Sequence, residues 1–165
     1  MRIISDSEIR TAIIRADDEF RSHLIWTLER WSLEPNSRWN DDALTFLRDV
    51  WPKQLSAKTP RVTSRLCGFA FAHTDRFQEY VDAILPLVIT ADPEELNLPI
   101  LRGSKDNLVE KYPDESLALL EVVLPKDAAR WPYGTADILK RISEADPALR
   151  SDVRLIELMR RWNSR

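Results

Sequence analysis

The chain of 165 residues contains little glycine, cysteine or histidine, and each shortage argues against a class of structure or site. Three glycines leave few positions for tight hairpin turns or phosphate-binding loops, which favours helices. A single cysteine, Cys67, excludes a disulfide framework and a cysteine-rich metal site within the chain. Because Cys67 lies within the apolar segment 66–71, we interpret it as a small buried side chain rather than a nucleophile.

Positive charge and long apolar runs are also scarce. The net charge of -3 argues against a general nucleic-acid binder, which usually carries an excess of lysine and arginine. The longest apolar run, AILPLVI at 83–89, is too short to cross a bilayer, and the start MRIISDSE lacks the apolar centre of a signal peptide. With 44% apolar and 31% charged residues, the chain reads as one globular domain over residues 1–165, and we expect a cytoplasmic protein without a membrane span.

What the chain does contain is helical periodicity, beginning with residues 5–31. Ser5 and Glu8 have the spacing of a capping box, which predicts a helix start. Apolar residues then recur every three or four positions from Ile9 to Trp31, with Phe20 among them, as on one face of a helix. The pattern predicts one long helix over 5–31. Ile25 and Trp26 broaden its apolar side, which could dock a partner or a second copy of the chain, so the oligomeric state stays open.

Three segments of twelve residues repeat one pattern later in the chain. They are DDALTFLRDVWP, DRFQEYVDAILP and DESLALLEVVLP, which begin at Asp41, Asp75 and Asp114 and lie 34 and 39 residues apart. Apolar pairs at their sixth and seventh and at their tenth and eleventh positions give each segment one buried helical face. We expect each Asp to lie at a helix start, where its carboxylate suits backbone N–H groups, and each Pro to mark a helix end.

A second amphipathic segment precedes the repeated segments, as in TPRVTSRLCGFAFAH, where Thr59 is a candidate helix cap. The last copy is degenerate, as expected for a terminal repeat that faces water. No segment has a pattern that favours a β-strand over a helix. The sequence therefore predicts an all-α fold of about four stacked αα-hairpins, a helical solenoid of the HEAT or armadillo type, that follows the long first helix. Its repeat units are expected at about 37–54, 59–88, 97–125 and 134–162.

The stretch WPYG at 131–134 links the third and fourth predicted hairpins. Pro132 and Gly134 fit the second and fourth positions of a type I turn, and Thr135 then fits a helix cap. We interpret Trp131 and Tyr133 as side chains that fill the gap between neighbouring hairpins. The alternative is that they contact a ligand or partner.

No arrangement of residues points to catalysis, a cofactor or a metal ion. The two histidines, His23 and His73, lie fifty residues apart without metal-binding spacing, and we interpret both as solvated or capping side chains. Acidic pairs such as Asp41-Asp42 and Asp114-Glu115 fall in predicted first helical turns, where acids are favoured without any catalytic role. A glycine-rich phosphate loop, a nucleophile elbow and a kinase-type set are all missing.

Two surfaces are candidates for binding. If the repeats stack in register, Asp41, Asp75 and Asp114 form an acidic rim that could receive a basic peptide of a protein partner. Basic residues on the first helices of successive pairs could instead share a concave face, as in helical-repeat DNA glycosylases; they include Arg61, Arg65, Arg102 and Arg141. The leading hypothesis is a non-enzymatic scaffold that binds a protein. The alternatives are a nucleic-acid-binding module and a hydrolase with an unrecognised site of acids and His73.

The segments 63–88 and 112–152, chiefly through WPYG and EADP, resemble an uncharacterised helical domain of bacteria. That domain lies at the C-terminus of some large proteins, after a sirtuin-like or other effector module linked to defence against phage. The resemblance covers roughly residues 60–155 and implies a helical accessory module without catalytic residues. No effector module precedes it in this sequence, from which we expect a stand-alone or truncated relative.

Overall fold

The structure is a computed structural model that describes residues 5–34, 39–55, 60–88 and 107–165. Within these ranges all regular elements are helices, which confirms the all-α prediction. The α-helices are α1 (Asp6–Arg15), α2 (Asp18–Ser32), α3 (Trp39–Thr45), α4 (Pro60–Ala72), α5 (Phe77–Val88), α6 (Leu108–Lys111), α7 (Pro113–Val123), α8 (Thr135–Ala145) and α9 (Val153–Asn163). Short helices complete them: the π-helix η1 (Phe46–Val50) and the 3-10 helices η2 (Lys53–Leu55), η3 (Thr74–Arg76), η6 (Ala128–Arg130) and η7 (Pro147–Ser151).

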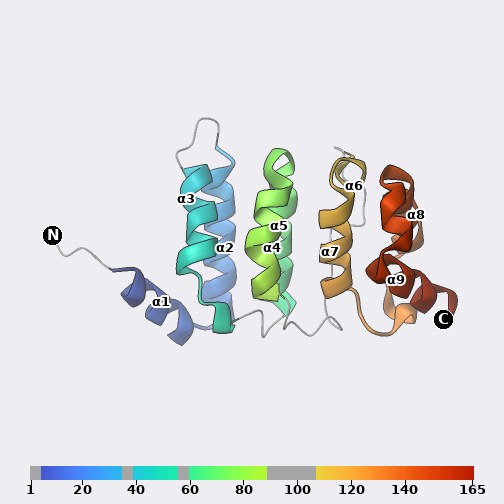
Figure 1. Cartoon of the computed structure of the whole chain (residues 1–165). Helices are drawn as coiled ribbons and strands as arrows, with labels where there is room; N and C mark the ends of the chain where they lie inside the picture. Colours follow the sequence, from blue (N-terminus) through green and yellow to red (C-terminus); the bar gives the residue numbers. More distant parts are fainter. Residues whose placement is uncertain (1–4, 35–38, 56–59, 89–106) are drawn as a thin grey trace.

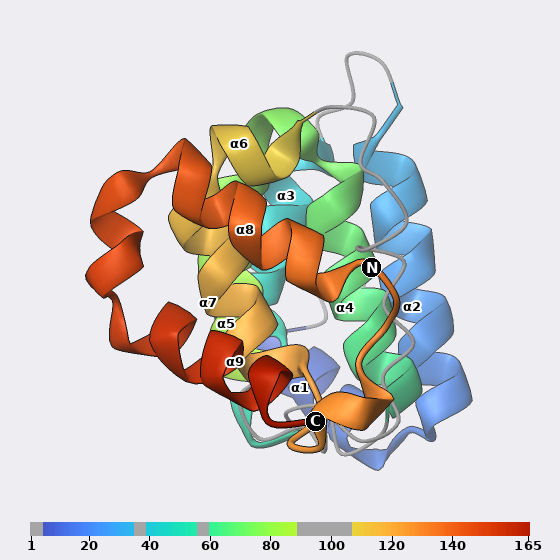
Figure 2. The same ribbon diagram turned by 90° about the vertical axis from the view of Figure 1, so that its right-hand side faces the viewer.

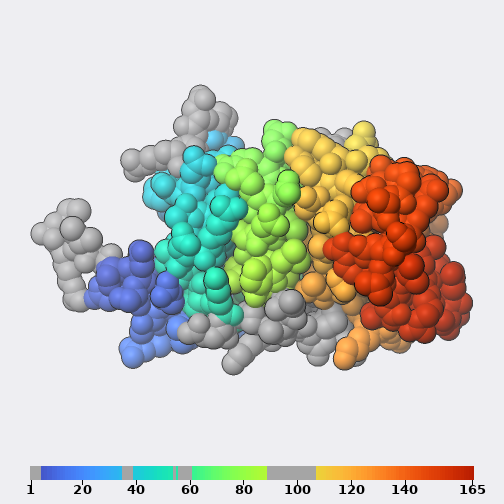
Figure 3. Space-filling model, viewed as in Figure 1, coloured from blue at the N-terminus to red at the C-terminus, as the bar shows by residue number. Residues whose placement is uncertain are grey.

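The helices succeed one another along the molecule in the order of the sequence (Figures 1 and 3). α2 packs against α3 and α4, α4 against α5, α5 against α7, and α7 against α8 and α9. Seen along the stack, α3, α5 and α7 lie on one side, and α2 and α4 lie on the other (Figure 2). The three helices that carry the repeated segments are therefore successive neighbours. The first half of the predicted unit 97–125 lies largely outside the described residues, as does Thr59.

The single helix predicted over 5–31 is wrong, because the chain breaks at Ala16 and Asp17. The capping box at the start is present, with the Glu8 backbone N–H donating to the Ser5 hydroxyl at 3.3 Å. Ala16 is extended, and the Asp17 carboxylate accepts the Phe20 N–H at 2.8 Å as the cap of a second helix. Arg21 closes the break by donating to the last carbonyls of α1, 3.0 Å from Ile13 O. A short acidic side chain competes for backbone N–H groups, so it favours a helix start over a helix interior.

The prediction that proline ends each repeated helix is confirmed in two segments and wrong in the third. Pro125 follows α7 directly after Leu124, and Pro52 follows the turn at Trp51 that ends the π-helix. Pro86, however, lies inside α5, which continues to Val88. In the last turn of a helix a missing N–H costs only one backbone hydrogen bond, so the helix can run on.

The buried side chains form two clusters that share α7. The larger cluster contains Phe69, Tyr80 and Trp51 and reaches from α1 to α7, where Leu119 belongs to it. The second cluster joins α7 to α8 and α9, and Leu117 belongs to that one. Cys67 is fully buried in the first cluster, and desolvation raises the pKa of its thiol to about 12. The prediction of a buried, unreactive cysteine agrees with both observations.

The turn at 131–134 confirms the packing role of Trp131 and contradicts that of Tyr133. Trp131 is 6% exposed, donates its indole N–H to Pro125 O at 2.6 Å and stacks on Trp162. Tyr133 is 102% exposed and fills no gap. The hydrogen bond that closes the turn runs from Thr135 N to Pro132 O, and Gly134 has φ 93. Gly134 is thus the third residue of a type II turn, not the fourth of a type I turn, and it replaces Thr135 as the helix cap.

Candidate functional site

The acidic rim predicted from the repeats is compensated by cations of the same chain. Asp41 Oδ1 lies 2.7 Å from Arg76 Nη1, Asp75 Oδ1 lies 3.7 Å from Lys111 Nζ, and Asp114 binds Arg154. Each cation comes from the unit that follows the aspartate, 35 to 40 residues later. All three carboxylates remain exposed, but none is an uncompensated charge. The rim therefore joins neighbouring units and is not a free acidic strip for a basic peptide.

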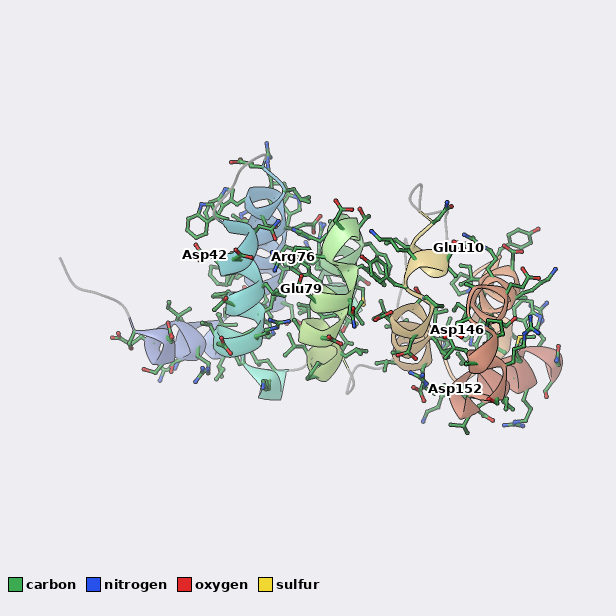
Figure 4. All side chains as sticks on the ribbon, turned by 45° about the horizontal axis from the view of Figure 1, so that its top comes forward. Asp42, Arg76, Glu79, Glu110, Asp146 and Asp152 are labelled. Atoms are coloured by element: carbon green, nitrogen blue, oxygen red, sulfur yellow. The ribbon has the colours of Figure 1, made fainter. Side chains whose placement is uncertain are left out.

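Arg76 is the most heavily bonded of these cations, and it lies between α3 and α5 (Figure 4). Its Nε and Nη2 donate to the two carboxylate oxygens of Glu79, each at 2.8 Å, and its Nη1 also donates to Asn40 Oδ1 at 2.8 Å. These hydrogen bonds hold the pKa of Glu79 below its ordinary value. Bidentate pairing fixes the guanidinium in one orientation, so Arg76 positions α5 against α3.

A second contact repeats with the first. The Tyr80 hydroxyl donates to Asn40 O at 3.0 Å, and the Tyr112 hydroxyl donates to Asp75 O at 3.1 Å. In both cases a tyrosine binds a backbone carbonyl at or next to the start of the preceding twelve-residue segment. The repeat found in the sequence thus includes polar contacts between units as well as apolar ones.

The candidate arginines have different roles. Arg61 and Arg65, on α4, line an open pocket of ≈ 420 Å³ together with Phe20, His23 and Trp26 of α2 and with two acids, Asp17 and Glu19. Arg141, on α8, forms a bidentate ion pair with Glu110 of α6, at 2.7 and 3.0 Å. Arg102 lies outside the described residues. The structure therefore brings Arg61 and Arg65 together beside aromatic side chains, whereas Arg141 holds two helices together.

The sequence pointed to part of an exposed apolar surface on α2 and α3, through Trp26, but placed Ile25, which is buried, beside it. Five large apolar side chains on α2, at its C-cap and on α3 are 37% to 52% exposed; they are Phe20, Trp26, Trp31, Leu33 and Trp39, called the aromatic surface below. The rings of Trp31 and Trp39 lie 5.4 Å apart, and the Arg30 guanidinium lies 5.6 Å from the Trp26 ring. Phe20 and Trp31 were expected on the buried face of the long helix.

The break between α1 and α2 explains this exposure. It changes which residues of α2 face the core, so the buried positions of that helix are Ser22, Ile25, Leu28 and Ser32. The acidic run Asp17-Asp18-Glu19 was the available sequence signal, because acids concentrate in the first turn of a helix. Recognising that run as a helix start would have separated the apolar stripe of α1 from that of α2, so that the buried face of α2 could be assigned independently.

His73 is buried, so the solvated alternative of the prediction is wrong, whereas the capping alternative is confirmed by its hydrogen bond to a carbonyl in the last turn of α4. Its Nδ1 lies 2.9 Å from Phe69 O and its Nε2 lies 2.8 Å from the Ser32 hydroxyl, and the ring stacks on Tyr80. A carbonyl can only accept, so Nδ1 carries the proton and donates to Phe69 O. Burial lowers the pKa of His73 below its ordinary value.

Ser32 and His73 have the spacing of a nucleophile and its general base, but their surroundings are those of a core. Both are at least nine-tenths buried, and the third partner is a backbone carbonyl where catalytic triads have a carboxylate. Within the described ranges, no group of three or more His, Cys, Asp or Glu side chains is placed to hold a metal ion. Likewise, the helices of those ranges include none that is long and apolar enough to cross a bilayer.

Comparison with known proteins finds one distant relative that matches nearly the whole chain. The chain is 26% identical over 164 residues to an uncharacterized protein, y4cA, of Sinorhizobium fredii (strain NBRC 101917 / NGR234). The match takes in 96% of this chain and spans 14% of the length of that protein. No protein-family profile and no solved structure matches the chain. The relative thus carries a similar region within a much longer polypeptide.

Proposed function

We propose that the chain is a non-catalytic scaffold of stacked helix pairs, of the HEAT or armadillo type, that docks a protein partner on the aromatic surface. The observation that carries the proposal is the aromatic surface itself, where five large apolar side chains remain exposed on two adjacent helices. Tryptophan and arginine are the residues most enriched at the energetic centres of protein interfaces. Exposed apolar patches of this kind typically mark interaction sites.

The charges around the aromatic surface define the partner. Arg30 lies over Trp26, and the pocket that Phe20 and Trp26 enter has Arg61 and Arg65 on its α4 side and the acids Asp17 and Glu19 at the start of α2. A segment with apolar side chains flanked by aspartate or glutamate would fill the pocket and neutralise these arginines. The length of the relative supports a role as one module of a larger protein. An association with effector-bearing defence proteins rests on the sequence resemblance alone.

A displayed random-peptide library tests this proposal without a known partner. We expect selection against the immobilised chain to enrich peptides in which acids flank apolar residues. The double substitution Phe20→Ser and Trp26→Ser should weaken their binding by at least about tenfold, the effect of losing roughly 1.4 kcal/mol. A matched control replaces two exposed apolar residues of α9, Val153→Ser and Ile156→Ser, and should leave binding unchanged. Enriched peptides that bind both double variants equally well would refute the proposal.

A second candidate function is single-stranded nucleic-acid binding, which the pocket between α2 and α4 favours. Arg61 and Arg65 share that pocket with Phe20 and Trp26 and with the acids Asp17 and Glu19. Arginines beside aromatic side chains are the groups that hold phosphates and stack bases. Fluorescence anisotropy with a labelled single strand tests it. Binding should weaken steeply between about 50 and 200 mM salt and disappear in Arg61→Gln, Arg65→Gln. Absence of binding at low salt removes this candidate.

A further inference from the structure

A groove lies between α8 and α9, at the opposite end of the stack from α2 and α3, which carry the aromatic surface (Figures 1 and 2). It has a volume of ≈ 360 Å³, and its lining is mostly apolar, with Leu139 from α8 and Leu155, Ile156 and Met159 from α9. Ile156 is 52% exposed, and Val153, one turn earlier on α9, is 77% exposed. The last helix of a stack is expected to turn polar side chains to water. An apolar groove beside two exposed branched side chains is instead typical of a surface that binds a partner.

The groove between α8 and α9 is positively charged. The described residues that line it include Arg150 and Arg160 but no aspartate or glutamate. Arg150 is held in place because its Nε donates to Ser143 O at 3.0 Å, and it forms no ion pair with any residue that the structure describes. Arg160 pairs with Glu157, but Glu157 also binds Arg161, so one acid compensates two cations. The groove therefore offers positive charge beside an apolar floor.

The recurring modes of peptide recognition include one that fits this lining. An added β-strand needs the edge of a sheet, and the part of the chain that the structure describes contains no strand. A proline-rich segment docks on aromatic side chains, and single-stranded nucleic acid stacks its bases on them, but the described lining of the groove contains no aromatic residue. A groove with an apolar floor between two helices accepts the apolar stripe of an amphipathic helix. The fitting occupant is therefore a helix.

The charge of this end of the molecule decides between a second copy of the chain and a different partner. Residues 147–165 contain five arginines and two acids, whereas the whole chain has a net charge of -3. Two copies that met through this groove would bring arginines against arginines, and like charges across an interface oppose binding. A helix with carboxylates beside its apolar stripe would instead pair with Arg150 and Arg160.

We infer that the groove between α8 and α9 is a second docking site, which binds an amphipathic helix with aspartate or glutamate beside its apolar stripe. The site lies at the other end of the stack from the aromatic surface, so two partners can be bound at once (Figure 1). The chain then links one protein to another. This inference goes beyond the proposed function, because either site can exist without the other and each is tested with its own variants.

Two designed helical peptides that differ only in charge test the groove. Both carry leucines at positions i, i+3 and i+7 of an alanine-rich helix, flanked by glutamates in one peptide and by lysines in the other. In a ¹H–¹³C methyl NMR spectrum, Ile156→Val identifies the δ1 methyl signal of Ile156 by its disappearance. The glutamate peptide should shift that signal saturably and bind at least about tenfold more tightly than the lysine peptide. The signal of Ile14, an exposed isoleucine of α1, should stay in place. An Ile156 signal that moves with neither peptide, or equal affinities for both, overturns the inference.

Substitutions separate this groove from the aromatic surface. Arg150→Glu reverses one charge of the groove, so it should weaken binding of the glutamate peptide by at least about tenfold and strengthen binding of the lysine peptide. The matched control Lys126→Glu makes the same change of charge outside the groove and should alter neither affinity. The double variant Phe20→Ser and Trp26→Ser should bind the glutamate peptide as tightly as the unchanged chain does, and peptides selected for the aromatic surface should not displace it. Equal affinities in Arg150→Glu and Lys126→Glu, or loss of binding in the double variant, would overturn the inference.

Discussion

Trp51 and Trp131 are both buried, with 2% and 6% of their surfaces exposed, yet only one of them has a partner for its indole N–H. Trp131 donates to Pro125 O at 2.6 Å, and Trp51 donates to nothing in the structure. Trp131 belongs to the second core cluster, and Trp51 belongs to the first and also lines a pocket. The same residue type thus completes the packing in one region and leaves a donor unused in the other.

The contrast extends beyond the two tryptophans. Three buried side-chain atoms without partners were found in the described chain, on Ser22, Trp51 and Thr63, and all belong to residues before α5. Ser22 lines the pocket between α2 and α4, and Trp51 lines the pocket beside the π-helix. From residue 107 onward, the described side chains include none of these atoms. The buried side-chain atoms without partners therefore lie in the first half of the molecule, among the elements that precede α5.

The largest expected effects come from the two cores. Phe69→Ala in the first cluster should lower the free energy of unfolding by about 3–5 kcal/mol, and Leu139→Ala in the second by about 2–5 kcal/mol. Because α7 contributes side chains to both clusters, each variant should still unfold in a single transition by circular dichroism in urea. Two separate transitions would mean that the two clusters unfold independently and differ in stability.

A smaller effect should follow the titration of His73. Its folded pKa is lowered by burial, whereas the unfolded chain has an ordinary value of about 6.5. Below about pH 6.5 the unfolded state therefore takes up a proton first, and stability falls as the pH decreases toward the folded pKa. Urea unfolding between about pH 8 and 5 measures this decline. It should be smaller in His73→Gln and unchanged in the control His23→Gln, and equal slopes in all three proteins would contradict the buried environment of His73.

The smallest effects are expected at the ion pairs between units. Double-mutant cycles should give roughly 0.2–1 kcal/mol for Asp41 with Arg76 and for Asp114 with Arg154, because these pairs are partly exposed. The pair of Asp75 with Lys111 is longer and more exposed, and should show no measurable coupling. Added salt should reduce the first two couplings. Equal coupling energies for all three pairs would contradict the differences in distance and exposure between them.

The all-α fold and the three repeated helices could be predicted because they depend on local periodicity and on Asp and Pro at fixed positions. The cations that pair with Asp41, Asp75 and Asp114 could not, since they are of two residue types and lie at unequal positions in the following unit. Each aspartate therefore looked like a helix cap or a free acid. Finding its partner required the packing of one unit on the next.

The helix start at Asp17 is the local feature that explains why the exposed aromatic surface was not fully predicted. Treating Asp17 as part of a long helix extended one stripe from α1 through Phe20 to Trp31, whereas a cap at Asp17 allows α2 to turn the face of Ile25 to the core. The pocket at Trp51 is less accessible to sequence reasoning. It depends on a π-helical turn and on Arg10, 39 residues away from the Asp49 carbonyl that it binds.

Trp131 and Trp51 differ in whether the indole N–H has a hydrogen-bond partner, and a pair of substitutions tests this difference most directly. Trp131→Phe removes a made hydrogen bond and leaves Pro125 O without its donor, so it should lower the free energy of unfolding by about 1–3 kcal/mol beyond the effect of the smaller ring. Trp51→Phe removes a donor that has no partner and should cost only the effect of the smaller ring. Urea unfolding of both variants at one pH should therefore show Trp131→Phe as the less stable protein. Equal losses, or a larger loss for Trp51→Phe, would show that the Trp51 donor is already satisfied and would contradict the account.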